Sequence, residues 1–339
     1  MTGPMGAGKK RFVRALALAL ALGVWAPPAA AAKLYVVYAS IGGTQAVGWV
    51  AREAGLFAKH GLDVELLFTG GGRAVTSLLG GDTPIVTVGG PSAIAARLGG
   101  SDVILIAHIF DTILYSLMVL PEVRSLADLK GKKIGASRFG SATDFSLRYV
   151  LSHNGMDPAK DVVIFQIGGQ AETLAALRSG SIQGGVIASP ATAEAKRLGM
   201  KELVNLATLG VPYPQTAVAT TDRYLRANRD TVLRFTRGYI DGARRFLADR
   251  EFSLKVIAKY TKIQNRPTLE ATYDDYAPYV KQRPLPTASS VQTVLDQLAP
   301  TDPRARAARP QEFIDPSVIA ELDREGFFPG PAGGAAGGR

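Results

Sequence analysis

The sequence predicts an α/β protein with two lobes, each built on a mainly parallel sheet with flanking helices. Two long segments, 34–100 and 133–200, repeat the same order of β-rich runs, glycine-containing loops and helical stretches. Of the 339 residues, 47% are hydrophobic, which is enough for more than one core. Strands that alternate with helices favour parallel pairing, because each helix returns the chain to the start of the sheet.

The first 32 residues have the layout of a secretory signal peptide. Four Lys and Arg residues between Lys9 and Arg14 precede an apolar run over 15–25, and small residues continue to Ala32. The sequence therefore predicts cleavage near Ala32 and an exported, periplasmic protein. Because the leader holds four positive charges and no negative one, its removal lowers the formal net charge from +10 to +6.

The two repeats predict the same elements in the same order. "LYVVYASIGG" and "KKIGASRFGSATD" are β-rich runs that end in Ser/Gly loops, and a helix that stops near Gly61 or Gly155 follows each. Next, "TGGGRAVTSLLGGDTPIVTVGGPSAIAARLGG" parallels "IGGQAETLAALRSGSIQGGVIASPATAEAKRLGM". Each repeat is thus predicted to be a β-loop-α unit repeated three times.

Two short strands between and after the repeats are predicted to cross between the lobes as a hinge. They are expected over 115–120 and 216–221, at the edges of the second unit. From Asp222 onward, apolar residues at helical spacing predict helices that pack on the first lobe. The expected boundaries are lobe I over 33–118 and 217–328, lobe II over 119–216, and a Gly/Ala/Pro-rich flexible tail over 329–339.

The loops that leave the carboxyl ends of parallel strands line the place where such sheets bind ligands. Each repeat offers three such loops, and glycine and helix amino termini let their backbone N–H groups approach a ligand. We therefore expect a solute cleft between the lobes. The candidate ligand-binding residues are Ser40, Gly42, Gly43, Thr44, Gly71, Gly72, Gly90, Ser92, Phe139, Ser141, Ala142, Thr143, Ser189, Pro190 and Tyr213.

Several polar residues near these loops have two interpretations. Arg73 could pair with a carboxylate or sulfonate or could be a solvated helix residue. Asp111 could pair with an amine or form part of a turn. Asp144 fits a first-turn helix charge better than a ligand contact. Tyr213 could cover the cleft or simply pack. The charge of the ligand therefore stays open.

Composition argues against several kinds of chemistry. The chain has no cysteine, so disulfides and thiol nucleophiles are excluded. The histidines His60, His108 and His153 are far apart, and there is no GxSxG nucleophile elbow. No basic run is interleaved with aromatic residues, so no nucleic-acid partner is expected. We predict no enzyme activity, no cofactor and no metal.

Taken together, the ordered motifs resemble solute-binding proteins of ABC importers in the nitrate, sulfonate, taurine and thiamine-precursor group. The resemblance covers about 33–299 and rests on "VGWVAREAGLFAKHGLDVELLFTGGG", "GDTPIVTVGGPSAIAA", "SLADLKGKKIGASRFGSATDFSLRYVL" and "LRSGSIQGGVIASPATAEA". It implies a two-lobed, type II periplasmic-binding-protein-like fold. It also implies a monomeric extracytoplasmic receptor that closes by hinge motion on a small anionic or heteroaromatic solute and delivers it to an ABC permease.

Two alternatives to this function stay open. An exported enzyme of the same fold could act on a pyrimidine or an aromatic acid. However, the fungal pyrimidine synthases that resemble this group carry a cysteine-rich motif that is absent here, and the menaquinone-pathway enzymes lack a signal peptide. Alternatively, the closed receptor could be the ligand-sensing partner of a membrane sensor rather than of a permease.

Overall fold

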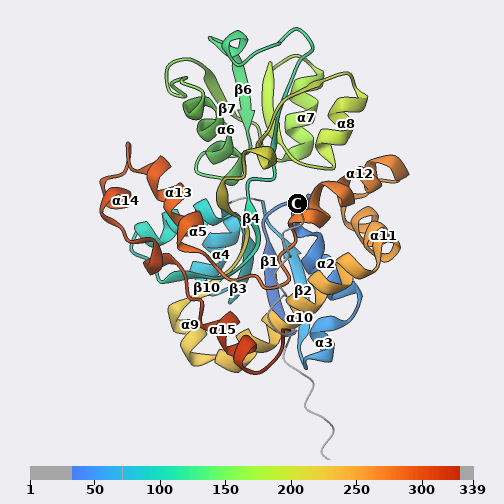
Figure 1. Cartoon of the computed structure of the whole chain (residues 1–339), viewed down its shortest axis with the longest axis vertical. Coiled ribbons are helices and arrows are strands. Elements are labelled where there is room, and N and C mark those ends of the chain that lie inside the picture. The colour runs from blue at the N-terminus through green and yellow to red at the C-terminus, as the bar shows by residue number, and fades with distance from the viewer. Residues whose placement is uncertain (1–32, 71, 329–339) are drawn as a thin grey trace, which may run out of the picture. The chain divides into compact units, whose positions relative to one another are not determined.

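The fold is described by a computed structural model over residues 33–70 and 72–328 (Figure 1). The predicted signal peptide, the candidate Gly71 and the predicted tail lie outside the described residues. Two five-stranded sheets with flanking helices make up the described chain, which confirms the α/β prediction.

The first sheet has the strand order β2-β1-β3-β10-β4. Strand β1 pairs in parallel with both β2 and β3, whereas β10 runs antiparallel to both β3 and β4. The bounds are Lys33–Tyr38 for β1, Asp63–Phe68 for β2, Ile85–Val88 for β3, Val103–Thr112 for β4 and Pro212–Thr221 for β10.

The second sheet repeats this arrangement in the order β7-β6-β8-β5-β9. Strand β6 pairs in parallel with β7 and β8, and β5 is antiparallel to β8 and β9. The bounds are Ser116–Val119 for β5, Lys133–Ala136 for β6, Val163–Gln166 for β7, Gly184–Ile187 for β8 and Lys201–Asn205 for β9.

The chain passes between the sheets twice, from β4 to β5 and from β9 to β10. Strands β5 and β10 lie at these two connections, where the chain enters and leaves the segment that forms the second sheet. Strand β5 lies inside the second sheet and β10 inside the first, so each has a neighbour on both sides. Nearly all their residues are accordingly buried.

Helices cover both sheets, and those after β10 begin at Asp222, as the helical spacing predicts. Figure 1 shows α6, α7 and α8 beside the strands of the second sheet. The helices are α2 (Ala46–Glu53), α3 (Leu56–Lys59), α4 (Arg73–Gly80), α5 (Gly90–Leu98), α6 (Ala142–His153), α7 (Gln170–Arg178), α8 (Ala191–Arg197), α9 (Asp222–Ala227), α10 (Arg229–Ala248), α11 (Arg250–Thr261), α12 (Arg266–Tyr276), α13 (Ala288–Leu298), α14 (Pro303–Ala307) and α15 (Ser317–Arg324). Short 3-10 turns are η1 (Gly43–Gln45), η2 (Ala127–Leu129), η3 (Leu206–Leu209), η4 (Ala277–Tyr279) and η5 (Pro310–Phe313).

Helix α10 packs closely on the helices that follow β1. A Cβ at Gly242 would lie 2.6 Å from the Ala51 Cβ and 2.8 Å from the Val47 carbonyl, so only glycine allows this approach. On the same side, Phe57 stacks on Phe235 with ring centroids 5.1 Å apart. These contacts hold the carboxyl-terminal helices on the first sheet.

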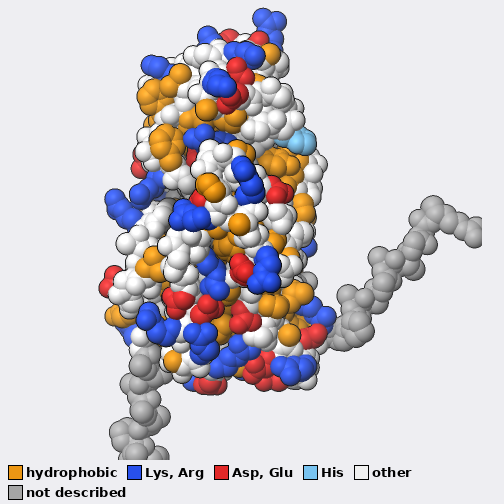
Figure 2. All heavy atoms as spheres, turned by 90° about the vertical axis from the view of Figure 1, so that its left-hand side faces the viewer, with side chains coloured by type: hydrophobic (Ala, Val, Ile, Leu, Met, Phe, Trp, Pro, Cys, Tyr) orange, Lys and Arg blue, Asp and Glu red, His pale blue; other side chains and the backbone are white. Residues whose placement is uncertain are grey.

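The described helices include none that is long and apolar enough to cross a membrane. On the face drawn in Figure 2, basic and acidic side chains are interspersed. Elsewhere along the described chain, several ion pairs join residues three or four positions apart, such as Arg245 with Asp249. Surface pairs of this kind contribute little to stability.

We predict that Gly242→Ala lowers the free energy of unfolding by about 1–3 kcal/mol, because the added methyl group overpacks the α10–α2 contact. Chemical denaturation measures the change. Gly80→Ala is the matched control, since a Cβ there meets nothing closer than 3.5 Å and alanine favours the helix. An unchanged or raised stability for Gly242→Ala would contradict the packing account.

Candidate functional site

A cavity of about 750 Å³ lies where loops from both sheets meet. Loops after β1, β2, β3, β6, β7 and β8 all contribute to its lining, and these are the six loops that the repeat predicts. We call this cavity the cleft. Among the candidate residues, those that line the cleft are Ser40, Thr44, Ser92, Ser141, Ala142, Thr143 and Pro190.

The other described candidates do not line the cleft. Gly42, Gly43, Gly72, Gly90, Phe139, Ser189 and Tyr213 fall in this group. Two of the glycines have packing roles, because a Cβ at Gly43 would lie 2.2 Å from the Tyr276 ring, and one at Gly90 would lie 2.1 Å from Pro214. No side chain would fit at either position.

The two aromatic candidates lie away from the cleft for different reasons. Tyr213 is fully buried and packs on Phe145, with ring centroids 4.6 Å apart, so the packing interpretation accounts for it. Burial raises the pKa of the Tyr213 hydroxyl well above its usual value. Phe139 is 54% exposed, and the Arg148 guanidinium lies 5.9 Å from its ring centroid.

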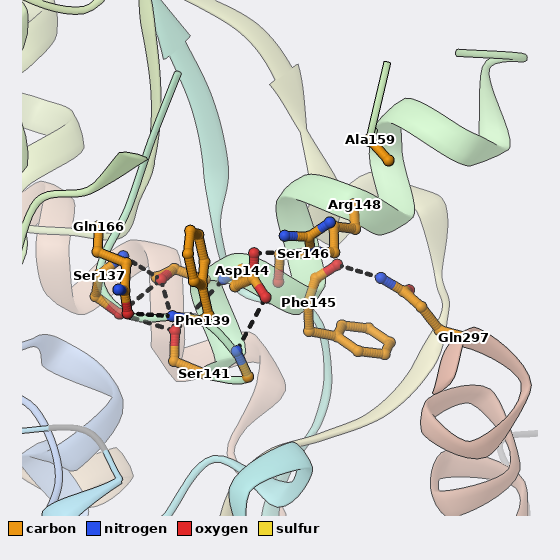
Figure 3. Close-up of polar contacts among 12 residues, drawn as sticks. Ser137, Phe139, Ser141, Asp144, Phe145, Ser146, Arg148, Ala159, Gln166 and Gln297 are labelled. Atoms are coloured by element: carbon orange, nitrogen blue, oxygen red, sulfur yellow. Dashed lines mark hydrogen bonds and ion pairs between the residues drawn. The ribbon is translucent and has the colours of Figure 1, made fainter. Parts of the chain in front are cut away.

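Three hydroxyl groups meet at the start of α6 (Figure 3). The Ser137 Oγ lies 2.9 Å from the Ser141 Oγ and 2.7 Å from the Thr143 Oγ1, and the last two are 3.1 Å apart. All three residues line the cleft. The Ser141 side chain also accepts from the Asp144 N–H, as an N-cap residue does. This corner of the cleft therefore combines hydroxyl groups with a helix amino terminus.

The Asp144 carboxylate stabilises the loop that precedes α6. It accepts from the Gly140 N–H at 3.0 Å and from the Arg148 Nε at 2.9 Å, and Asp144 does not line the cleft (Figure 3). The interpretation as a first-turn helix charge is confirmed. Asp144 thus fixes the loop that carries the hydroxyl groups.

Three glutamines that line the cleft were not among the candidates: Gln45, Gln170 and Gln215. Gln45 directly follows the candidate Thr44, and Gln170 directly follows the Gly168-Gly169 pair of the second repeat, so the sequence held a signal for both. Gln215 lies in β10, and nothing in the pattern of that strand indicates which of its residues reaches a cavity.

Charged side chains of both signs line the cleft. Arg73 and Arg138 form no ion pair with any other described residue. Glu194 is held by Arg197, through hydrogen bonds of 2.8 and 2.5 Å. Glu172 folds back over the start of its own helix, where a Cβ on Gly169 would lie 2.7 Å from the carboxylate. Glu194 is thus paired locally, whereas no hydrogen bond or ion pair joins Glu172 to another described residue.

Tyr115 lines both the cleft and a smaller cavity of about 180 Å³. Burial raises the pKa of its hydroxyl to about 12, and the nearby Gln215 amide offsets part of the rise. The Gln215 Nε2 nevertheless makes no hydrogen bond within the described residues. The tyrosine therefore stays protonated at neutral pH and can donate a hydrogen bond.

Ser189 joins the two sheets beside the cleft. Its carbonyl accepts from the Gly43 N–H at 3.1 Å and from the Tyr276 hydroxyl at 2.9 Å, and its Oγ donates to the Asp275 carboxylate. Gly43, Asp275 and Tyr276 belong to segments that flank the first sheet, whereas Ser189 follows β8 of the second. We call these contacts the Ser189 junction.

Asp111 lies outside the cleft and accepts from the Thr287 hydroxyl at 3.3 Å. The His108 Nδ1 lies 3.1 Å from the Ser290 Oγ and 3.4 Å from Asp111. Because both neighbours face the same ring nitrogen, these residues do not have the relay geometry of a catalytic triad. Within the described chain, no group of three His, Asp or Glu residues could hold a metal ion.

A family model described as NMT1/THI5 like matches residues 45–251, which is more than half of the chain. A relative in Bacillus subtilis (strain 168), the binding-protein candidate YtlA, is 29% identical over 199 residues. That match covers 56% of this chain and 58% of YtlA, so the chain matches little more than half of that relative's length.

Solved structures have the same fold. The alkanesulfonate-binding protein SsuA from Xanthomonas axonopodis pv. citri, bound to MOPS, has a TM-score of 0.69 at 19% identity, covering 86% of this chain and 98% of that one. The periplasmic nitrate-binding protein NrtA from Synechocystis PCC 6803 has a TM-score of 0.70 at 13% identity, covering 87% and 89%. One enzyme, DSZB, solved as a mutant in complex with biphenyl-2-sulfinic acid, has a TM-score of 0.60 at 16% identity, covering 86% and 99%.

We predict that Tyr276→Phe weakens the Ser189 junction and lowers the free energy of unfolding by about 0.5–1.5 kcal/mol, because one hydrogen bond to a buried carbonyl is lost. Urea denaturation measures the loss. Tyr279→Phe is the control, since no hydrogen bond joins its hydroxyl to another described residue. Equal stability for the two variants would contradict a role for the Tyr276 hydroxyl.

The junction also predicts a pH dependence. Burial against the surrounding chain raises the pKa of Asp275 from 3.8, although Ser189 and Lys196 act in the opposite direction. A carboxyl with a raised pKa in the folded state binds its proton more tightly there, so its contribution to stability falls as pH rises through that pKa. The unfolding free energy of the protein, minus that of Asp275→Asn, should therefore fall as pH rises from about 3.

Asp128 supplies the contrasting control. The backbone N–H groups of Arg124 and Ser125 lower its pKa, so its contribution is lost as pH falls. The unfolding free energy of the protein, minus that of the Asp128→Asn variant, should therefore increase over the same rise in pH. Slopes of equal sign for the two comparisons would contradict the assignment for Asp275.

Proposed function

Because the chain belongs to the NMT1/THI5-like family, we propose that it is an extracytoplasmic solute-binding protein of an ABC importer. The observation that carries the proposal is the cleft, in which loops from the carboxyl ends of both sheets meet around one cavity. A concave, partly apolar cavity with a few polar groups is the usual form of a small-molecule site. The binding roles of the SsuA and NrtA neighbours support the same function.

In this proposal the protein works as a monomer that closes on its solute and presents both lobes to a permease. The lobes expected over 33–118 with 217–328 and over 119–216 would carry the first and the second sheet, with their boundaries at the connections before β5 and before β10. They would rotate about the two connections between the sheets, because these are the places where the chain passes from one to the other. The solute would shift the population toward the closed state by binding that state more tightly.

The proposal also includes export of the protein to the periplasm. The predicted signal peptide over 1–32 and the periplasmic names of relatives such as NrtA support it. The candidate contacts to the solute are the hydroxyl groups at the start of α6 and the residues of the loops after β1, β3 and β8. A ligand-sensing role with a membrane sensor would use the same cleft and the same closure.

An enzyme of the same fold is the second candidate function, since DSZB is one. The described cleft contains no histidine and no thiol, and its polar side chains carry hydroxyl, amide, guanidinium and carboxylate groups. Such groups bind and orient a solute, but none has the arrangement of an activated nucleophile with a neighbouring base. Binding therefore accounts for the cleft better than catalysis does.

We predict that one solute class raises the melting temperature of the protein, because a ligand bound only by the folded state stabilises that state. At one hundred times Kd the stabilisation is about 2.7 kcal/mol. A thermal-shift screen with alkylsulfonates, nitrate, pyrimidines and aromatic acids measures it, and X-ray scattering then tests for compaction. A bound solute that leaves the scattering profile unchanged would contradict closure, and multiple-turnover product formation would favour the enzyme.

A further inference from the structure

The Ser189 junction depends on donors that belong to the other sheet. The Ser189 carbonyl follows β8 of the second sheet, and it accepts from the Gly43 N–H at 3.1 Å and from the Tyr276 hydroxyl at 2.9 Å. A carbonyl oxygen has two lone pairs, so these two donors satisfy it. Gly43 and Tyr276 both lie on segments that flank the first sheet. Separation of the sheets would therefore remove both partners of this carbonyl at once.

The ring and the hydroxyl of Tyr276 contact different parts of the protein. The ring lies against Gly43, where an added Cβ would be 2.2 Å away, and its centroid is 5.9 Å from that of Phe110 in β4. The hydroxyl reaches across to Ser189 of the second sheet. The packing of the ring thus belongs to the first sheet, whereas the hydrogen bond depends on the approach of the second.

A second contact between the sheets requires glycine at position 89. Gly89 follows β3 and caps α5, and a Cβ there would lie 2.9 Å from the Cβ of Ala142, which begins α6 after β6 of the second sheet. The φ of Gly89 is −66°, which any residue adopts. Apart from Ala142, the nearest atom to that Cβ would be the Gln215 carbonyl oxygen at 3.8 Å. The approach of the second sheet alone therefore excludes a side chain at position 89.

A third contact is a single hydrogen bond from a half-satisfied amide. Gln297 lies on α13, which packs on β10, and its Nε2 donates to the Phe145 carbonyl of α6 at 2.9 Å (Figure 3). The Gln297 Oε1 is buried and has no hydrogen bond to another described residue. An acceptor buried in this way costs free energy that contact with water would return. Separation of the sheets would hydrate this amide as it breaks the hydrogen bond, so the contact is a reversible one.

We propose that these three contacts form a latch, which is made when the two sheets approach and broken when they separate. Ser189 and Tyr276 do not line the cleft, so they are positioning residues that act through the placement of the sheets rather than by contact with the solute. This inference rests on the proposed closure and adds the residues that control it. Since affinity falls in proportion to the closed fraction of the free protein, a weaker latch would lower the affinity for any solute.

Hydrogen exchange of the Gly43 amide, measured by NMR on the free protein, tests the latch without a solute. This N–H exchanges when its hydrogen bond to Ser189 opens, so its exchange rate measures how often the latch is open. The Val37 amide in the buried strand β1 supplies the comparison, because it exchanges with global unfolding. We expect the Gly43 amide to exchange faster than the Val37 amide and with a weaker dependence on urea.

Gly89→Ala adds the methyl group that the latch excludes. It should raise the exchange rate of the Gly43 amide about tenfold, because the overpacked contact keeps the second sheet away. Adding Ala142→Gly removes the opposing methyl group and leaves the residue 142 Cα at 3.9 Å, so the rate should return to within about threefold of the original. A substitution that merely damaged the first sheet would not be rescued in this way.

Gly72→Ala is the matched control for Gly89→Ala. Gly72 caps α4 of the first sheet as Gly89 caps α5, but a Cβ there meets nothing within 4 Å. It should change the exchange rate of the Gly43 amide less than about twofold.

Tyr276→Phe tests the Ser189 side of the latch. Loss of the hydroxyl should raise the exchange rate of the Gly43 amide about threefold to tenfold, while the ring keeps its place against Gly43. Tyr279→Phe is its control and should change the rate less than about twofold. Circular dichroism checks that each variant is folded, and Tyr276→Phe decides the question if Gly89→Ala does not fold.

The outcomes separate the latch from the binding function. The latch is overturned if the Gly43 amide is as protected as the Val37 amide, or if the variants leave its exchange unchanged. If a solute of the thermal-shift panel then still binds and compacts the protein, the binding function stands without the latch. If the latch opens as expected but no bound solute compacts the protein, the proposed closure fails instead.

Discussion

The structure depends on one constraint of parallel sheets, which is that the carboxyl ends of parallel strands lie along one edge. In each sheet three parallel strands release their loops at that edge, and in this chain all six loops reach the same cavity. The constraint brings distant segments together: Ser40 and Ser92 line the cleft with Ser141 and Pro190. An antiparallel pair would send successive loops to opposite edges.

The Ser189 junction joins the two sheets directly beside the cleft. The Gly43 N–H donates a hydrogen bond to the Ser189 carbonyl. The residues that follow these two in the chain, Thr44 and Pro190, both line the cleft. The Tyr276 ring occupies the space that a side chain at Gly43 would need. Any change in the distance between the two sheets must therefore alter the cleft wall and this contact together.

The sequence predicted the order of elements and the cleft loops, because repeats and glycine positions are local signals. The glycine pattern predicts ligand contacts at Gly43 and Gly90, whereas the structure places Tyr276 and Pro214 against them. The sequence does not indicate Gln215, because every residue of its strand after Pro212 is buried and the strand pairing decides which side chain faces the cleft. Local patterns identify loops, but neighbours from distant segments decide which side chains reach the cavity.

The proposed function requires that one solute in the cleft brings the two sheets closer together. Because the chain has no cysteine, Leu79→Cys on α4 and Val163→Cys on β7 would place spin labels at two exposed sites. Electron-spin distance measurement on this double variant, with and without a saturating solute from the screen, tests the claim. The account predicts a shift of the distance distribution to one narrow, different value; an unchanged distribution at proven saturation would contradict it.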